Sequence, residues 1–156
     1  MQETQVKAAY LAKFASYVEW PAGRLADDAS PLVIGVVGAE ALADELEAQS
    51  QGKSVRGHPI RVRRFDSDGP VADAHLLFIG PADAATLDAI FTRLRGKAVL
   101  TVADSPSAQA RGSMITFLVR NRRLRFEVAL PPASESQIRF SALLLTAAHR
   151  VSGDRR

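Results

Sequence analysis

Three short apolar runs constrain the fold of this chain more than any other feature of its sequence. They lie at residues 32–37, 74–79 and 98–102 and are rich in Val, Ile and Leu. Continuous apolar runs of this length are typical of strands buried on both faces of a sheet. Amphipathic helices are predicted after the first two runs, at residues 39–50 and 84–94, and a short helical turn is predicted around Pro106. We therefore predict an α/β fold, with a mainly parallel central sheet of five to six strands flanked by helices on both faces.

The C-terminal part follows a different pattern. Residues 114–119 and 124–130 are separated by the polar stretch 120–123, which predicts an antiparallel hairpin. In its second strand, Leu124, Phe126 and Val128 alternate with Arg125 and Glu127, so one side is expected to be buried and the other to display charge. After Pro131 and Pro132, a closing helix is predicted from Ile138 onward, with Ser134 or Ser136 as its cap.

An amphipathic helix is predicted near the start of the chain, over residues 8–20. Its expected apolar face carries Val6, Tyr10, Phe14, and Tyr17 with Val18. Pro21 disfavours helical geometry at the residue before it, so the helix is expected to end at Trp20. Core packing is the default role for Trp20, and docking of a ligand or partner is the alternative.

Composition sets limits on the class of protein. A chain of 156 residues with 47% hydrophobic residues is expected to form one domain, residues 1–156. No run approaches the roughly 20 apolar residues that span a bilayer. The absence of Cys excludes disulfides. The first five residues have neither the basic start nor the apolar run of an export signal, so the residues alone would also permit a cytoplasmic protein.

Basic residues gather in clusters although the net charge is only +3. Nucleic-acid phosphates, anionic lipid or an acidic partner could each meet such clusters. Solvated strand faces are the more ordinary explanation. Arg61 and Arg63 alternate with Ile60 and Val62, as in an edge strand that buries only one face. The clusters are Arg61, Arg63 and Arg64; Arg120, Arg122, Arg123 and Arg125; and Arg150, Arg155 and Arg156.

No catalytic, metal or cofactor motif is convincing. The segment Gly35–Gly38 lacks the third glycine of a dinucleotide-binding loop. His58, His75 and His149 lie far apart, so structural roles are expected for them rather than zinc binding. Asp104 and Ser105 follow a strand, where a helix cap is the simplest role. We therefore expect no enzyme activity and no cofactor.

Eight segments of the chain, in order, resemble the YfiR-like family, small periplasmic proteins of bacteria that regulate membrane-bound signalling enzymes. The chain lacks the cysteines that many members carry, and Gln137 stands where the family often has Gly. The segments are YLAKFASYVEWP (10–21), PLVIGVVG (31–38), GKSVRGHPIRVRR (52–64), AHLLFIG (74–80), GKAVLTVAD (96–104), GSMITF (112–117), RLRFEV (123–128) and IRFSALLLTAA (138–148).

This resemblance implies a non-enzymatic periplasmic protein whose signal peptide has been removed and whose Met1 was added for expression. It implies a regulator that represses the sensory region of an inner-membrane diguanylate cyclase, lowering cyclic di-GMP, and that forms a homodimer. A sensor kinase is the alternative membrane partner, an outer-membrane lipoprotein is a further one, and nucleic acid is not expected. The residues proposed to contact the partner are Arg125, Glu127, Arg139, Glu19 and Trp20.

Two other functions compete with partner binding. A small-ligand-binding sensor domain would use a crevice at the carboxyl ends of the parallel strands, near Gly38, Gly80 and Asp104. An enzyme with an unusual site would depend on Asp104 or a histidine, and it ranks last.

Overall fold

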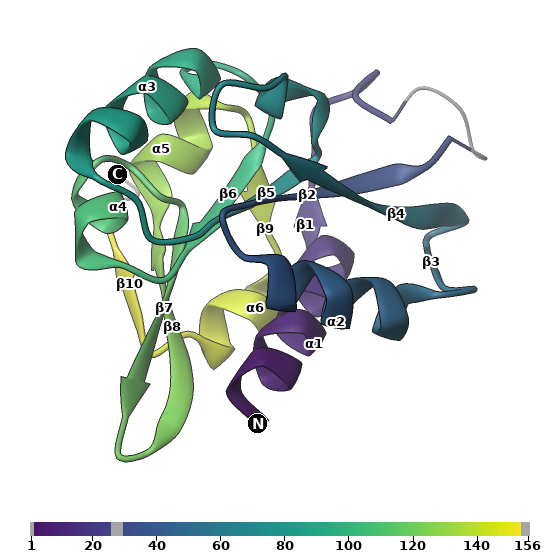
Figure 1. Cartoon of the computed structure of the whole chain (residues 1–156), viewed down its shortest axis with the longest axis horizontal. Helices are drawn as coiled ribbons and strands as arrows, with labels where there is room; N and C mark the ends of the chain where they lie inside the picture. Colours follow the sequence, from purple (N-terminus) through teal and green to yellow (C-terminus); the bar gives the residue numbers. More distant parts are fainter. Residues whose placement is uncertain (1, 26–29, 154–156) are drawn as a thin grey trace.

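A computed structural model describes residues 2–25 and 30–153. Figure 1 shows a central sheet with helices packed around it. The elements are α1 (Gln2–Ser16), β1 (Val18–Glu19), β2 (Leu32–Val37), α2 (Glu40–Ser50), β3 (Ser54–Val55), β4 (His58–Phe65), the 3₁₀ helix η1 (Val71–Asp73), β5 (Leu76–Ile79), α3 (Ala84–Leu94), β6 (Leu100–Ala103), α4 (Pro106–Ala110), β7 (Ile115–Arg120), β8 (Arg123–Ala129), α5 (Leu130–Glu135), β9 (Arg139–Phe140), α6 (Ala142–Ala147) and β10 (Arg150–Ser152).

The main sheet has the strand order β10-β8-β7-β6-β5-β2-β4-β3. Strands β4, β2, β5, β6 and β7 are parallel to one another, and β8 pairs antiparallel with β7. This arrangement confirms the predicted fold class. Two short strands, β3 and β10, extend the six longer ones at the two edges. Strands of two or three residues carry no readable alternation, so the sequence did not indicate them.

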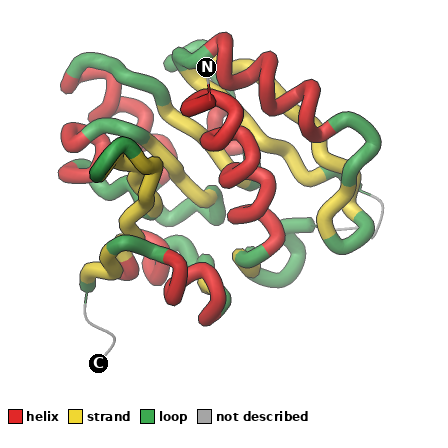
Figure 2. Tube along the Cα trace, turned by 90° about the horizontal axis from the view of Figure 1, so that it is seen from below, coloured by secondary structure: helices red, strands yellow, loops and turns green. Residues whose placement is uncertain are grey.

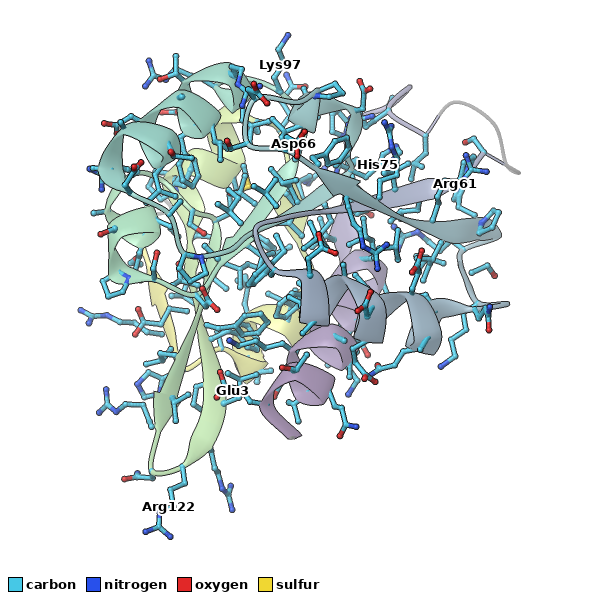
Figure 3. The ribbon with its side chains drawn as sticks, viewed as in Figure 1. Glu3, Arg61, Asp66, His75, Lys97 and Arg122 are labelled. Carbon is cyan, nitrogen blue, oxygen red and sulfur yellow. The ribbon has the colours of Figure 1, made fainter. Side chains whose placement is uncertain are left out.

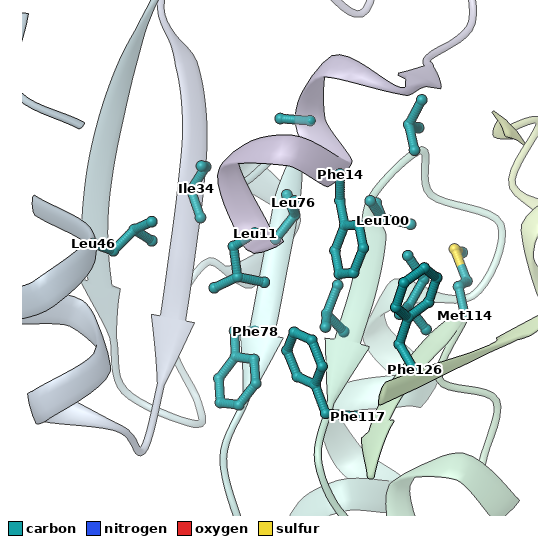
Figure 4. Packing of buried hydrophobic residues seen from close by; sticks show 14 of the residues in the cluster. Leu11, Phe14, Ile34, Leu46, Leu76, Phe78, Leu100, Met114, Phe117 and Phe126 are labelled. Carbon is teal, nitrogen blue, oxygen red and sulfur yellow. The ribbon is translucent and has the colours of Figure 1, made fainter. Parts of the chain in front are cut away.

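Both faces of the sheet are covered, as predicted. Alternate residues of β2 explain how: Ile34 belongs to the core cluster beneath α1 and α2, whereas Val33 belongs to the cluster beneath η1, α3 and α4. Figure 2 shows helices on either side of the strands. In the first cluster, the ring of Phe14 packs 4.9 Å from Phe126 and 5.8 Å from Phe117, measured between ring centroids (Figure 4).

Helix α1 differs from its prediction at both its ends and in its buried face. Its described part begins at Gln2, before the predicted start at residue 8, and it ends at Ser16, where Val18–Glu19 continues as a strand. Phe14 and Val18 are buried and Tyr10 is partly buried, as predicted, whereas Val6 and Tyr17 are each 39% exposed. Leu11, which was not predicted on the apolar face, is buried too, because the helix packs against both α2 and β8.

The C-terminal segment is also more divided than predicted. Pro131 and Pro132 begin helix α5 as well as ending β8, and the closing helix is only Ala142–Ala147. Its cap is Ser141, whose Oγ accepts a hydrogen bond from Leu144 N at 3.2 Å, and not Ser134 or Ser136. Arg139 and Phe140 are taken into strand β9 instead of the helix. Arg155 and Arg156, in the third basic cluster, lie outside the described residues.

The predicted hairpin is formed by β7 and β8. Asn121 and Arg122 make its two-residue turn, with φ values of 52° and 63°. Positive φ at both turn positions defines the turn type whose twist suits two antiparallel strands.

Candidate functional site

A small two-stranded sheet brings together three of the five predicted partner-binding residues. Strand β1 pairs antiparallel with β9, and in this register Glu19 lies opposite Arg139. Trp20 follows Glu19 directly. We use the name β1–β9 corner for this surface and define it by Tyr17, Glu19, Trp20, Arg56, Arg139 and Phe140. Two neighbouring depressions, of about 320 and 300 Å³, are lined by these residues, and Glu19 and Arg56 border both.

The charges at the corner are available to a partner. Among the described residues, neither Glu19 nor Arg139 has an ion-pair partner, although they face each other across the strand pair. Tyr17 is 39% exposed beside them, and Phe140 is half-buried. Tyrosine, tryptophan and arginine are the residues that most often dominate binding energy at protein interfaces. The corner therefore has the chemistry of a protein-binding surface.

Arg56 is a corner residue that the sequence reasoning missed. Arg56 and Gly57 form the two-residue turn between β3 and β4, with φ values of 49° and 88°. From this turn, the Arg56 guanidinium donates hydrogen bonds to Ser16 O at 2.8 Å and to Val18 O at 3.0 Å. It thereby satisfies backbone oxygens where α1 gives way to β1. The Arg-Gly pair just before β4 was the only signal in the sequence.

Trp20 is anchored to the main sheet through His75. The indole Nε1 of Trp20 donates to His75 O at 2.8 Å, and the two rings meet edge to face with centroids 6.0 Å apart. Trp20 is half-buried and packs against the core cluster. Its polar atom is thus committed inward, and its remaining exposed edge lines the second depression. This geometry fits both roles considered for Trp20: its inner side packs against the core, and its exposed edge can contact a ligand or partner.

His75, whose position is labelled in Figure 3, is a satisfied structural histidine, as predicted. Its Nδ1 accepts a hydrogen bond from Val33 N at 2.9 Å, so Nε2 carries the proton and faces Arg24 O at 3.2 Å. Burial, together with the charge of the nearby Arg24 guanidinium, lowers the pKa of His75 to about 4. The ring is therefore neutral at physiological pH and serves as a fixed hydrogen-bonding group.

Arg24 ties the segment after Trp20 to neighbouring loops. Its guanidinium donates to the backbone oxygens of Ala72, Ala74 and Ala98. Burial lowers the pKa of Arg24, and the charge of Asp73 partly offsets this effect. These bonds fix the exit of the corner against the amino ends of β5 and β6.

Arg125 and Glu127 do not join the corner. They alternate on β8 with Phe126, which packs against Phe14 of α1, so their side chains project from the opposite face of the strand. Glu127 Oε1 accepts a hydrogen bond from Gln109 Nε2 at 2.7 Å, whereas Arg125 is exposed and has no ion-pair partner among the described residues. In Figure 1 the hairpin extends away from β1 and β9. The five predicted residues therefore belong to two separate surfaces.

The crevice expected at the carboxyl ends of the parallel strands is largely filled. Gly80 N donates to Val37 O at 2.8 Å, and a Cβ built on Gly80 would lie 2.4 Å from Gly38 O. Lys7 of α1 reaches across to Asp104, with 2.9 Å between Nζ and Oδ2. A depression of about 290 Å³ remains beside this pair, near the lower limit for small-molecule pockets. Ligand binding there stays a prediction.

Two further properties bear on the class of protein. No helix in the part of the chain that the structure describes has the length and apolar content needed to cross a membrane. Within those same residues, no three or more His, Asp or Glu side chains gather where they could hold a metal ion.

Ser105 caps α4, with its Oγ accepting from Ala108 N at 3.2 Å, which agrees with the structural role predicted for this position.

Comparison with known proteins now adds to this geometry. A family model described as YfiR/HmsC-like matches residues 4–149. The chain belongs to the YfiR/HmsC-like family. The resemblance found in the sequence is thereby confirmed over nearly the whole chain. Membership suggests a regulator connected with diguanylate cyclase signalling rather than an enzyme.

A solved structure shares the fold. It is the crystal structure of a conserved domain protein from Vibrio cholerae O1 biovar El Tor strain N16961, with a TM-score of 0.68 and 9% sequence identity. The match covers 96% of this chain and 60% of that protein, so this chain spans somewhat over half of its length. At this identity the likeness concerns the fold alone.

Proposed function

We propose that this protein is a periplasmic regulator that binds the sensory region of an inner-membrane diguanylate cyclase through the β1–β9 corner and represses the enzyme. Family membership supports the signalling role. The observation that carries the choice of surface is the unpaired Glu19 and Arg139, placed opposite each other among three aromatic side chains.

Repression at a distance requires preferential binding. The cyclase domain lies across the membrane from a periplasmic regulator, so the regulator acts only by binding an inactive conformation of the sensory region more tightly than an active one. To shift the sensory region from a ratio of 1:99 to 99:1 between inactive and active conformations, the regulator must bind the inactive one roughly 10⁴-fold more tightly. Charged and aromatic groups on a firmly anchored corner suit this task, because little conformational entropy is lost when such groups are covered.

The test uses charge reversal at the corner. The chain is immobilised and exposed to solubilised native membranes, and retained proteins are identified by mass spectrometry. Affinity for the sensory region of the retained cyclase is then measured for the wild type, Arg139→Glu and Glu19→Lys. We expect each variant to bind at least about tenfold more weakly. Lys97→Glu, an exposed charge reversal elsewhere on the surface (Figure 3), is the matched control.

A cellular measurement completes the test. In a strain that lacks the native protein, expression of the wild-type chain in the periplasm should lower cyclic di-GMP, and expression of Arg139→Glu should not. Retention of no cyclase, or full repression by both corner variants at equal protein levels, would contradict the proposal. If only a sensor kinase is retained, the cyclase part of the proposal is wrong and the corner variants still test the surface.

A further inference from the structure

Strand β4 has an open edge. On one side it pairs with β2 from Ile60 to Phe65. On the other side β3 pairs with it only at His58 and Pro59, and Ile60 N donates outward to Lys53 O at 3.2 Å. Because alternate residues of a strand direct their backbone groups to the same side, Val62 and Arg64 present their N–H and C=O groups outward. No strand among the described residues pairs with them.

A groove runs beside this edge. It has a volume of about 750 Å³ and lies between β4 and the second half of α2. Ile60, Arg61 and Val62 are among the residues that line the strand side, and Asp44 and Glu47 line the helix side. An exposed strand edge with an adjacent groove is the arrangement that binds an extended peptide by β-strand addition: the backbone supplies hydrogen bonds, and the groove receives alternate side chains.

The charges on the two faces of β4 indicate which segment fits. Arg61 and Arg63 lie on the face away from α2. Arg61 has no ion-pair partner in the described chain. The Cζ atom of Arg63 lies 4.7 Å from the centroid of the Phe65 ring, and its Nη1 lies 3.8 Å from Asp73 Oδ2. On the α2 face, the Arg64 guanidinium is already paired with three acidic side chains: Glu40, Asp44 and Glu47. An added strand therefore fits best with carboxylates over Arg61 and Arg63 and apolar side chains toward the groove.

The same charges disfavour a second copy of this chain. If two β4 edges paired about a twofold axis, the arginines of one copy would lie across from those of the other on one face of the joined sheet. Like charges placed opposite each other destabilise a strand pair. A shift of the added peptide by one residue is disfavoured too, because its carboxylates would then face Asp44 and Glu47.

We propose that the open edge of β4 binds an extended segment of another protein in which acidic and apolar residues alternate. This goes beyond the proposed repression, because it uses none of the corner residues. Arg139→Glu and Glu19→Lys should therefore leave it intact, so the two proposals can fail separately.

The experiment uses a fluorescein-labelled peptide that alternates Glu and Val over nine residues, with a Lys and Val peptide of the same pattern as a control. We expect saturable binding of the acidic peptide by fluorescence anisotropy and at least about tenfold weaker binding of the basic one. Arg61→Glu should weaken the acidic peptide to a similar degree. Arg122→Glu, at the hairpin tip far from Arg61 in Figure 3, should not. Arg61 and Arg122 are both exposed, so neither change should impair folding.

Amide hydrogen exchange locates the peptide. Bound acidic peptide should slow exchange at Val62 and Arg64, whose amides face the open edge. Three results would overturn the proposal: no saturable binding of the acidic peptide, equal binding to the wild type and Arg61→Glu, or slowed exchange confined to other strands. Slowed exchange at the same two amides without peptide, together with a dimer in sedimentation, would assign the edge to a second copy instead.

Discussion

At the scale of single residues, His75 links acidity to stability. The pKa of His75 is about 4 in the folded protein and its ordinary value is 6.5, so between these values the unfolded chain binds more protons than the folded one. The contribution of His75 to stability is complete above pH 6.5 and is lost as the pH falls toward 4. Protonation of Nδ1 would also remove the acceptor for Val33 N.

We expect His75→Asn to flatten this dependence. Asn offers an oxygen near the position of Nδ1 but does not titrate. Chemical unfolding at pH 7.5, 6, 5 and 4.5 should show that the wild type loses about 2 to 3 kcal/mol more than the variant over this range. The variant starts from a lower stability at pH 7.5 because the fit is imperfect. His149→Asn, an exposed histidine, should keep the wild-type slope. Parallel curves for His75→Asn and the wild type would show that His75 does not titrate on unfolding.

The Lys7–Asp104 pair is a second prediction at this scale. Burial lowers the pKa of Lys7, but hydrogen bonds and charge attraction from Glu3 and Asp104 outweigh it and raise the pKa overall. Asp104 Oδ1 is buried without a hydrogen-bond partner, so Lys7 supplies the main compensation for this carboxylate. Lys7→Met should lower the free energy of unfolding by about 2 to 3 kcal/mol, because it leaves a nearly buried charge unpaired.

A double-mutant cycle checks this explanation. Adding Asp104→Leu to Lys7→Met should recover at least half of the loss, and Lys13→Met, on the exposed side of α1, should have little effect. Additive losses in the double variant would mean that the two residues stabilise the fold independently.

The sequence reasoning was strongest for residues whose role is local. The role of Ser105 as a cap followed from its place after a strand, and the structural role of His75 followed only from the wide spacing of the three histidines, which did not indicate its partners Val33 and Arg24. Glu19 lies opposite Arg139 because two strands 120 positions apart in the chain pair with each other. Local sequence patterns do not predict a pairing over that separation. Arg56 was missed for the same reason, since its partners Ser16 and Val18 lie on another element.

At the scale of elements, boundaries with a local cause were predicted accurately. Helix α3 occupies Ala84–Leu94 as expected, and the Asp83 side chain caps it by accepting from Thr86 N at 2.8 Å. The prediction placed the end of helix α1 at Trp20, which is too late, because Pro21 prevents the helix from continuing but does not prevent it from ending earlier. Its actual end at Ser16 is imposed by the pairing of β1 with β9. The closing helix was likewise shortened when Arg139 and Phe140 entered that pair.

The turn of the β7–β8 hairpin gives an element-scale prediction. Arg122 adopts a φ of 63°, which is costly for a residue with a side chain and favourable for glycine. Arg122→Gly should therefore stabilise the protein by about 0.5 to 1 kcal/mol in chemical unfolding, as in the preferred Asn-Gly hairpin turn. Arg123→Gly places glycine one position later, inside β8, and should destabilise by a similar amount. Equal effects of the two changes would show that turn geometry is not the cause.

At the scale of the whole molecule, the corner depends on the main sheet for its position. The two-stranded β1–β9 sheet is too small to be stable alone. Trp20 fastens it to His75, and Arg24 fastens the following segment to three backbone oxygens near the amino ends of β5 and β6. Arg56 adds a third connection from the β3–β4 turn. We therefore expect binding of the proposed partner to be coupled to global stability through these links and not through Glu19 or Arg139, which make no ion pair within the described chain.

Arg24→Met distinguishes residues that anchor the corner from residues that are proposed to contact the partner. It leaves three partly buried carbonyl oxygens without this donor, and we expect it to lower the free energy of unfolding by about 2 to 4 kcal/mol. Partner affinity should fall as well, because the corner loses its anchor, although Arg24 itself need not touch the partner. Arg139→Glu should show the opposite division, with weaker binding and a melting temperature within a few degrees of the wild type. Arg93→Met, at an exposed position of α3, controls for the loss of an arginine that also binds backbone oxygens. Wild-type affinity of folded Arg24→Met would mean that the corner holds its shape without this anchor, and a large drop in melting temperature for Arg139→Glu would assign Arg139 to the fold instead of the interface.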